Sequence, residues 1–267
     1  MGLFDFLKKK PADEDVKPQP SVEQSQPSTP AKTPYLGDLE KTQRIGQLVQ
    51  TPHTERDDAW QQAFLENALQ ASFRCGDPQI ITGPDGFPYF QLFLPEPNQP
   101  FQCFVIEHMK DDFLLSSGYG VVINPTQAQP DWVFSYGDIV NLHINQAFYT
   151  TGKTLFSKNA QQDEVIKENE EVLTGQPAES ILPAATRQVL SQFLKAQGVV
   201  EPKVLLMQRS NPQTKEMTQD IVLNTTPENF ESEEKYRAVM QSIRWFLPNH
   251  YSYAGMSEKT LSNFMPL

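Results

Sequence analysis

The stretch that comes nearest to a catalytic or ligand-binding motif is residues 147–154, which read AFYTTGKT. This pattern fits a phosphate-binding loop if alanine is allowed at the first position, and it follows a predicted strand. Such a loop must bend so that its backbone N–H groups point inward, and Phe148 and Tyr149 with no early glycine hinder that bend. No apolar strand ending in Asp follows to position a magnesium ion. We therefore predict an ordinary turn and no nucleotide-binding residues.

The second stretch that could do chemistry contains His108, Asp111 and Asp112. A histidine one helical turn from two carboxylates could bind a metal ion if the segment is helical. A solvated strand end or a helix cap explains the same residues, so we predict no metal site. His143 lies between two asparagines on the polar face of a predicted strand, where a surface or interface histidine is expected.

The rest of the sequence contains no recognisable catalytic motif. The nucleophile elbow, the zinc-protease helix and a Cys–His arrangement are all missing. The only cysteines, Cys75 and Cys103, lie among apolar residues and cannot form a disulfide framework, so buried thiols in a reducing compartment are expected. We predict no catalytic residue and no cofactor. A non-enzymatic protein is favoured, although an enzyme stays open because carboxylate chemistry leaves little trace in one sequence.

Composition and charge narrow the possible partners. The 267 residues carry a net charge of −11 and 38% hydrophobic residues. A surface of this sign repels phosphate backbones, so no nucleic acid partner is expected. No apolar run approaches the roughly 20 residues of a membrane-spanning helix. The first residues also lack the order of a signal peptide. We therefore expect a soluble cytoplasmic protein without a transmembrane segment.

The N-terminal residues 1–35 are predicted to be a disordered tail. From Pro11 to Pro34 prolines mix with Ser, Gln, Thr and charges, a composition that buries too little apolar surface to fold. Residues 1–10, MGLFDFLKKK, combine two aromatic rings with three lysines. This pattern leaves open a weak contact with a membrane surface.

The remaining residues predict an α+β fold in two domains, each a small, mostly antiparallel sheet with packed helices. Residues 36–146 form the N-terminal domain, in which a helix starts near Thr54 and ends near Phe73. Apolar runs around the Gly83–Gly86 turn predict a hairpin. Further strands are predicted at 101–106, 120–123, 131–136 and 140–145.

Residues 147–172 are predicted to be a linker, and residues 173–267 form the C-terminal domain. There, a turn at 175–177 precedes a helix that begins near Pro183 and ends at Gly198. Strands follow at 204–207 and 219–223, then a helix capped by Ser232. The pattern ends with a strand near 251–254 and a short helix from Ser257.

On the helix predicted for residues 233–247, one large aromatic side chain falls on the polar face. At 100° per residue, Trp245 falls opposite the apolar face, near Gln241 and flanked by Arg237 and Arg244. A large aromatic side chain on a polar face requires a partner. Packing against the last helix or the other domain would provide one. The alternative is a protein-binding surface made of Trp245, Arg244, Arg237 and Gln241.

Several of these segments resemble a known bacterial family. Residues 172–177 (VLTGQP), Leu182-Pro183 and the helix and strand that follow are similar to the C-terminal domain of the enhanced serine sensitivity proteins. The helix at 57–73 and the sequence DGFPYF at 85–90 are loosely similar to that family's N-terminal domain. The resemblance implies a two-domain cytoplasmic bacterial protein and supplies no catalytic residue.

Together these observations favour a non-enzymatic protein-interaction or regulatory module with an unidentified protein partner. The alternative is a small-molecule-binding protein or enzyme with a pocket between the two domains.

Overall fold

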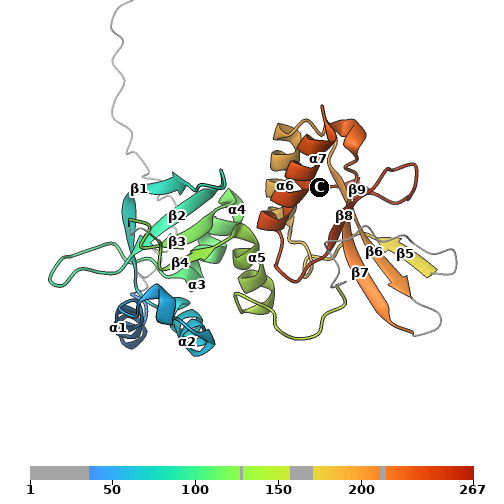
Figure 1. The fold of residues 1–267 in the computed structure, drawn as a ribbon. Helices are drawn as coiled ribbons and strands as arrows, with labels where there is room; N and C mark the ends of the chain where they lie inside the picture. Colours follow the sequence, from blue (N-terminus) through green and yellow to red (C-terminus); the bar gives the residue numbers. More distant parts are fainter. Residues whose placement is uncertain (1–35, 127–128, 157–170, 211–214) are drawn as a thin grey trace, which may run out of the picture. The chain divides into compact units, whose positions relative to one another are not determined.

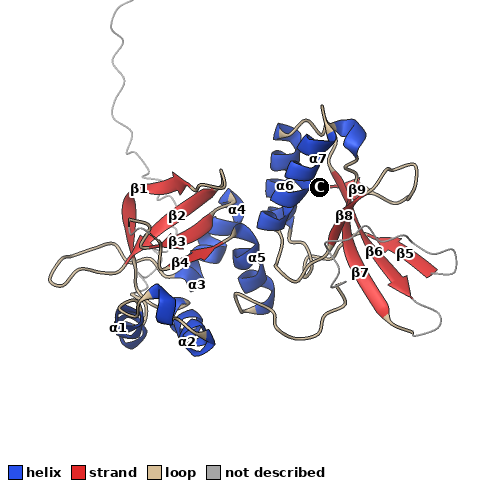
Figure 2. Ribbon diagram, in the orientation of Figure 1, coloured by secondary structure: helices blue, strands red, loops and turns tan. Residues whose placement is uncertain are grey.

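Two mixed β-sheets flanked by helices make up the fold (Figures 1 and 2). The computed structural model describes residues 36–126, 129–156, 171–210 and 215–267, which lie within one compact unit. The predicted α+β class is confirmed. In the described residues no helix is both long and apolar enough to cross a membrane. The expectations for the tail and for membrane contact by residues 1–10 lie outside the described residues.

The first sheet has the strand order β1-β2-β3-β4. Its strands are β1 (Arg74–Thr82), β2 (Pro88–Phe93), β3 (Gly120–Ile123) and β4 (Trp132–Phe134). The predicted hairpin is confirmed, since β1 and β2 pair antiparallel around the turn at 83–86. Strand β3 pairs parallel with β2 and antiparallel with β4, so the connection from β2 to β3 must cross over.

Helices occupy the rest of this half. They are α1 (Leu39–Leu48), η1 (His53–Glu55), α2 (Asp58–Ala68), α3 (Ile106–Met109), the π-helical turn η2 (Lys110–Leu114), α4 (Leu115–Ser117) and α5 (Tyr136–Asn145). Helix α1 was not predicted, because order was expected only near Thr54. The carboxylate of Asp38 caps it by accepting from two backbone N–H groups. Helix α2 begins after Asp57, which caps it, and the predicted cap Thr54 lies in η1.

The predicted strand at 140–145 is wrong, because these residues belong to α5 (Figure 2). Ser135 and Asp138 form a capping box, in which each side chain accepts from the other residue's backbone N–H. All seven residues from 136 to 142 are buried. The first two turns of α5 are therefore enclosed on all sides and have no polar face, so the alternation of apolar and polar residues in the sequence did not indicate a helical period.

The predicted strand at 101–106 is also wrong. Only Phe104 makes a ladder contact, an isolated bridge with Phe73, and α3 begins at Ile106. The two thiols are also less buried than predicted, because Cys75 and Cys103 are both partly exposed. Both are free cysteines.

The second sheet has the order β5-β6-β7-β8, with β9 also pairing with β6. Its strands are β5 (Glu171–Gly175), β6 (Lys203–Ser210), β7 (Met217–Leu223), β8 (Tyr253–Gly255) and β9 (Met265–Pro266). The predicted strands at 204–207 and 219–223 are confirmed as parts of β6 and β7. Strand β5 was missed, because its residues were assigned to the linker and the following turn. No helix forms from Ser257.

Two longer helices accompany this sheet, α6 (Ala184–Ala196) and α7 (Glu233–Ile243), with the 3-10 turns η3 (Pro227–Asn229) and η4 (Arg244–Phe246). Both helices were predicted, and Ser232 caps α7 by accepting from the backbone N–H of Lys235. The sheet has apolar residues on both faces. Leu205, Met207 and Val222 form a separate small core on one face, while Val204, Ile221 and Leu223 join the main core. The proposed domain boundary at 147–172 stays a prediction.

Candidate functional site

Trp245 does not lie on an exposed helix face. Helix α7 ends at Ile243 and continues as the tighter turn η4, so a rotation of 100° per residue no longer places the side chain. Trp245 is only 8% exposed. Its ring stacks on Phe87 with centroids 4.3 Å apart, and its Nε1–H donates to the Tyr89 hydroxyl at 2.8 Å. An exposed binding surface centred on Trp245 is therefore excluded.

Tyr89, in strand β2, connects Trp245 to the first sheet. Its hydroxyl donates to Asp85 at 2.5 Å, and its ring lies in a slot beside Gly83 and Gly120, where a Cβ at either position would meet it within 2.7 Å. Burial and the Asp85 carboxylate raise the pKa of Tyr89 above its ordinary value. The phenol stays neutral and donates. This aromatic junction comprises Phe87, Tyr89, Tyr136, Phe193, Trp245 and Phe246.

The other residues of the predicted binding surface are exposed. Arg237 pairs with Glu233 one helical turn away at 2.5 Å, and Gln241 and Arg244 also lie on the surface. An exposed pair of this kind is weak, since the ions stay hydrated. Without Trp245 this surface loses its aromatic anchor. Partner binding by Arg237, Gln241 and Arg244 stays a prediction.

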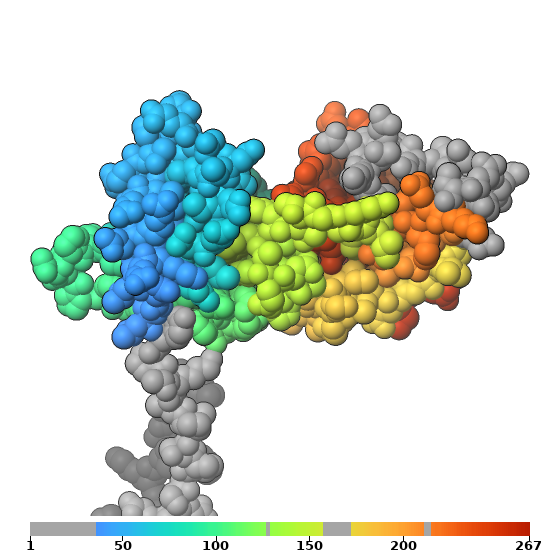
Figure 3. Space-filling view, turned by 90° about the horizontal axis from the view of Figure 1, so that it is seen from below, coloured from blue at the N-terminus to red at the C-terminus, as the bar shows by residue number. Residues whose placement is uncertain are grey.

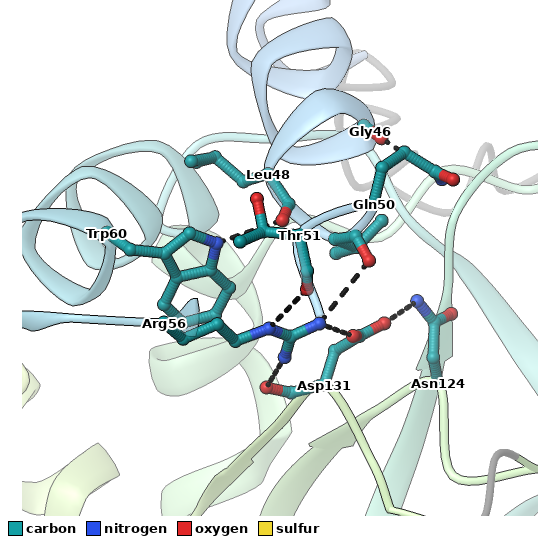
Figure 4. Close-up of polar contacts among 9 residues, drawn as sticks. Gly46, Leu48, Gln50, Thr51, Arg56, Trp60, Asn124 and Asp131 are labelled. Carbon is teal, nitrogen blue, oxygen red and sulfur yellow. Dashed lines mark hydrogen bonds and ion pairs between the residues drawn. The ribbon is translucent and has the colours of Figure 1, made fainter. Parts of the chain in front are cut away.

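A buried ion pair joins the first helices to the sheet (Figure 4). Arg56, in the connection between η1 and α2, donates to Asp131 Oδ1 at 2.6 Å. Asn124 donates to the other carboxylate oxygen at 2.6 Å. The guanidinium also donates to the backbone carbonyls of Thr51 and Val49 and lies over the Trp60 ring, 4.4 Å from its centroid. Both carboxylate oxygens are occupied, so the cluster is suited to holding the fold.

A second cluster joins Lys110 and Asp111, both in η2, to His143 in α5. Asp111 accepts from Lys110 at 2.6 Å and pairs with His143 Nδ1 at 2.7 Å. Partial burial opposes ionisation, but hydrogen bonds from Lys110 and His143 outweigh it and lower the pKa of Asp111. The Lys110 ammonium also donates to the Glu107 carbonyl. The cluster thus links η2 to α5.

His108 does not belong to a metal centre in the described residues. His108 lies in α3, while Asp111 and Asp112 lie in η2. No group of three or more His, Cys, Asp or Glu side chains in the described ranges could hold a metal ion. Sequence spacing therefore placed His108 near two carboxylates without arranging the three for coordination.

Residues 147–154 lack the structural context of a phosphate-binding loop, because they follow helix α5 and not a strand. Asn141, which is 1% exposed, fixes the start of this segment. Its Nδ2 donates to the Ala147 carbonyl at 2.8 Å, and its Oδ1 accepts from Asn145 at 2.8 Å and from Thr150 at 3.1 Å. The segment is thus held against the end of α5.

This segment and α2 enclose a groove of about 850 Å³. In Figure 3 the blue residues of α1 and α2 lie beside the yellow-green residues near 150. One wall is helix α2, and the other combines the C-terminal end of α5 with residues 146–151. Its apolar side chains are Leu65, Leu69, Leu142, Phe148 and Tyr149. The groove therefore offers an apolar interior assembled from segments far apart in the sequence.

The rim of the groove is polar, and most of its side chains come from α2. They are Asp58, Gln61, Gln62, Glu66 and Gln146, with Lys41 also in the lining. Burial raises the pKa of Tyr149 above its ordinary value, and the Asp138 carboxylate adds to the shift. The phenol therefore stays uncharged. An apolar floor with a rim of amides and carboxylates is the usual composition of a binding site.

The sequence did not reveal this groove. Trp60, Phe64 and Ala68 form the buried stripe of α2, whereas Leu65 and Leu69 are only half-buried. In the sequence all five recur at helical spacing, a pattern that by itself indicates a single core face. The available signal was the width of the apolar stripe, which exceeds what one packed face requires.

Comparison with protein-family models, with curated proteins and with solved structures found no match for this chain. The resemblance to the enhanced serine sensitivity family, carried by residues 172–177 and the following helix and strand, therefore stays a prediction.

Proposed function

We propose that this protein is a non-enzymatic protein-interaction module that binds its partner in the groove between α2 and residues 142–151. The observation that carries this proposal is the coexistence of an apolar floor and a polar rim in a groove of about 850 Å³. Leu65 and Leu69 are half-buried there, so a partner's apolar side chains would remove them from water.

The construction of the second wall supports the proposal. Asn141 hydrogen bonds hold the Ala147 carbonyl and the Thr150 hydroxyl in place. Phe148 is buried and stacks on Phe134 with centroids 4.1 Å apart. A wall that is already ordered loses little conformational freedom when a partner binds, which favours affinity.

A small-molecule-binding protein or enzyme is the second candidate, because the groove's volume falls within the roughly 300–1,000 Å³ of small-molecule sites. The same groove, and not a pocket between two domains, would then be the site. A thermal-shift screen of metabolites distinguishes this candidate, since a ligand that binds the folded state raises the melting temperature.

Site-specific photo-crosslinking in cells tests the proposal. A photoreactive residue replaces Gln62 on the groove rim in one variant and Gln241 on α7 in a matched control. Both glutamines are exposed on helices. We expect a defined protein adduct from position 62 and none from position 241. Adducts only from position 241 would show that the partner binds at α7 and not in the groove. Adducts from neither position would contradict the proposal.

A further inference from the structure

We infer that the groove between α2 and residues 142–151 binds a cationic amphipathic α-helix of a partner protein. This inference rests on the proposed function and adds the conformation and the charge of the ligand. Two independent features of the lining carry it. The first is the secondary structure of the walls, and the second is the distribution of their charges.

The walls favour a helical ligand over an extended one. No residue of the lining belongs to a strand; α2 and α5 satisfy most of their backbone groups internally. The Ala147 carbonyl is already bonded to Asn141. A partner therefore finds no strand edge to extend and must satisfy its own backbone hydrogen bonds, which a helix does.

The spacing of the apolar side chains fits the same ligand. Leu65 in α2 and Leu69, the C-cap residue of α2, are four residues apart and lie one above the other. On the other wall Tyr149 is half-buried, whereas Leu142 and Phe148 are 1% and 5% exposed and form the floor of the groove. A ligand helix with apolar residues at intervals of three and four can contact both walls along one stripe.

The carboxylates on the rim favour a ligand helix that has basic residues beside its apolar stripe. Helix α2, with the sequence DAWQQAFLENA, contains no lysine or arginine. Its two lining carboxylates, Asp58 and Glu66, are eight residues apart, which is about 12 Å along a helix.

The other polar groups of the rim do not reverse this charge. The Lys41 ammonium donates to the amide oxygen of Gln70, and Glu66 accepts only a neutral amide hydrogen bond from Gln62 among the described contacts. Two carboxylates against one ammonium leave the lining acidic. A ligand with Lys or Arg two turns apart complements it.

Binding of designed peptides to the full chain tests the inference by fluorescence anisotropy. The probe is a labelled 18-residue helical peptide with a leucine stripe flanked by lysines; its counterpart carries glutamates instead. We expect the lysine peptide to bind at least tenfold more tightly than the glutamate peptide. Its affinity should also fall as salt is raised from 50 to 300 mM.

Paired variants assign the effect to the groove. Asp58→Asn with Glu66→Gln removes the two rim carboxylates, and Glu231→Gln with Glu234→Gln removes two exposed carboxylates elsewhere. We expect the first pair to weaken binding of the lysine peptide roughly three- to tenfold, as the loss of two exposed charge pairs predicts. The second pair should change it less than twofold.

Three outcomes would overturn the inference. They are equal binding of both peptides, equal effects of the two variant pairs, or no binding of the lysine peptide at all. Each leaves the crosslinking result at Gln62 unaffected. If position 62 gives an adduct but the two peptides bind equally, the groove remains the binding site and its preference for a basic helix is excluded.

Discussion

Asp131 and Asp138 are both buried carboxylates, but their neighbours differ. Asp131 is paired with the Arg56 guanidinium, whereas Asp138 accepts from the backbone N–H of Ser135 and forms no ion pair among the described residues. Burial outweighs the hydrogen bonds from Ser135 and raises the pKa of Asp138 to about 6. The two acids therefore respond to different perturbations.

For Asp131 the test is removal of its cation. Arg56→Met keeps an apolar stem over Trp60 but leaves the carboxylate buried and unpaired. We expect a loss of about 3–5 kcal/mol in the free energy of unfolding, measured with urea. Arg74→Met, which breaks the more exposed pair with Glu96, serves as control and should cost no more than about 1 kcal/mol. Equal losses would contradict the structural role of Arg56.

For Asp138 the test is pH. Its folded pKa of about 6 lies above the unfolded value of 3.8, so folding favours the protonated acid. Its stabilising contribution is complete below pH 4 and is lost as pH rises through 6. Asp138→Asn removes this titration. Relative to the parent protein, the variant should therefore gain on the order of 3 kcal/mol between pH 4 and pH 7.5. Urea unfolding across this range measures the difference, and a constant difference would contradict it.

Residue types alone predicted few of these contacts. Arg56 and Asp131 are 75 residues apart, and Trp245 and Tyr89 are 156 apart. Nothing local in the sequence reports such pairs. Helix caps are different, because capping acts within three residues, and the prediction that Ser232 caps α7 is confirmed.

At the scale of elements, α5 approaches the end of η4 closely enough that only glycine fits. A Cβ at Gly137 would lie 2.1 Å from the Leu247 carbonyl oxygen. Both groups are backbone, so relief would require α5 to move away from the segment that carries Trp245.

Gly137→Ala should therefore destabilise the protein by at least about 2 kcal/mol, in the range of an overpacked core. Gly152→Ala and Gly46→Ala are the controls, because a Cβ at either position meets nothing within 4 Å. The first should change stability by less than about 0.5 kcal/mol. The second lies within α1 and should stabilise by about 1 kcal/mol. Thermal unfolding of all three tests the close contact.

Helix α6 was predictable from its period, because it has one buried face and ends before Gly198. Strands β6 and β7 have apolar residues on both faces and were predictable as short apolar runs. Helix α5 was not predicted as a helix, because its first two turns are buried on every side and lack the polar face that defines a helical period. Helix α1 was missed because Leu36 and Leu39 are exposed and its buried residues are few.

At the scale of the whole molecule, the α+β class and the two sheets were predictable because composition and strand periodicity are summed over many residues. The contact between the two sheets through the aromatic junction was not predictable from the sequence. It depends on glycines at 83, 120 and 137, which the sequence suggests only as turns or breaks. The groove was equally hidden, since its walls come from residues about 80 positions apart.

The positions of the three tryptophans have a spectroscopic consequence. Trp60 of α2 packs against Trp132 of β4, with ring centroids 6.0 Å apart, whereas Trp245 lies in the junction against Phe87 and Tyr89. Replacing Trp60 and Trp132 with phenylalanine would leave a single emitter whose indole N–H is bonded to a phenol. Its emission would report separation of the two sheets, while the parent spectrum would also report the packing of α2.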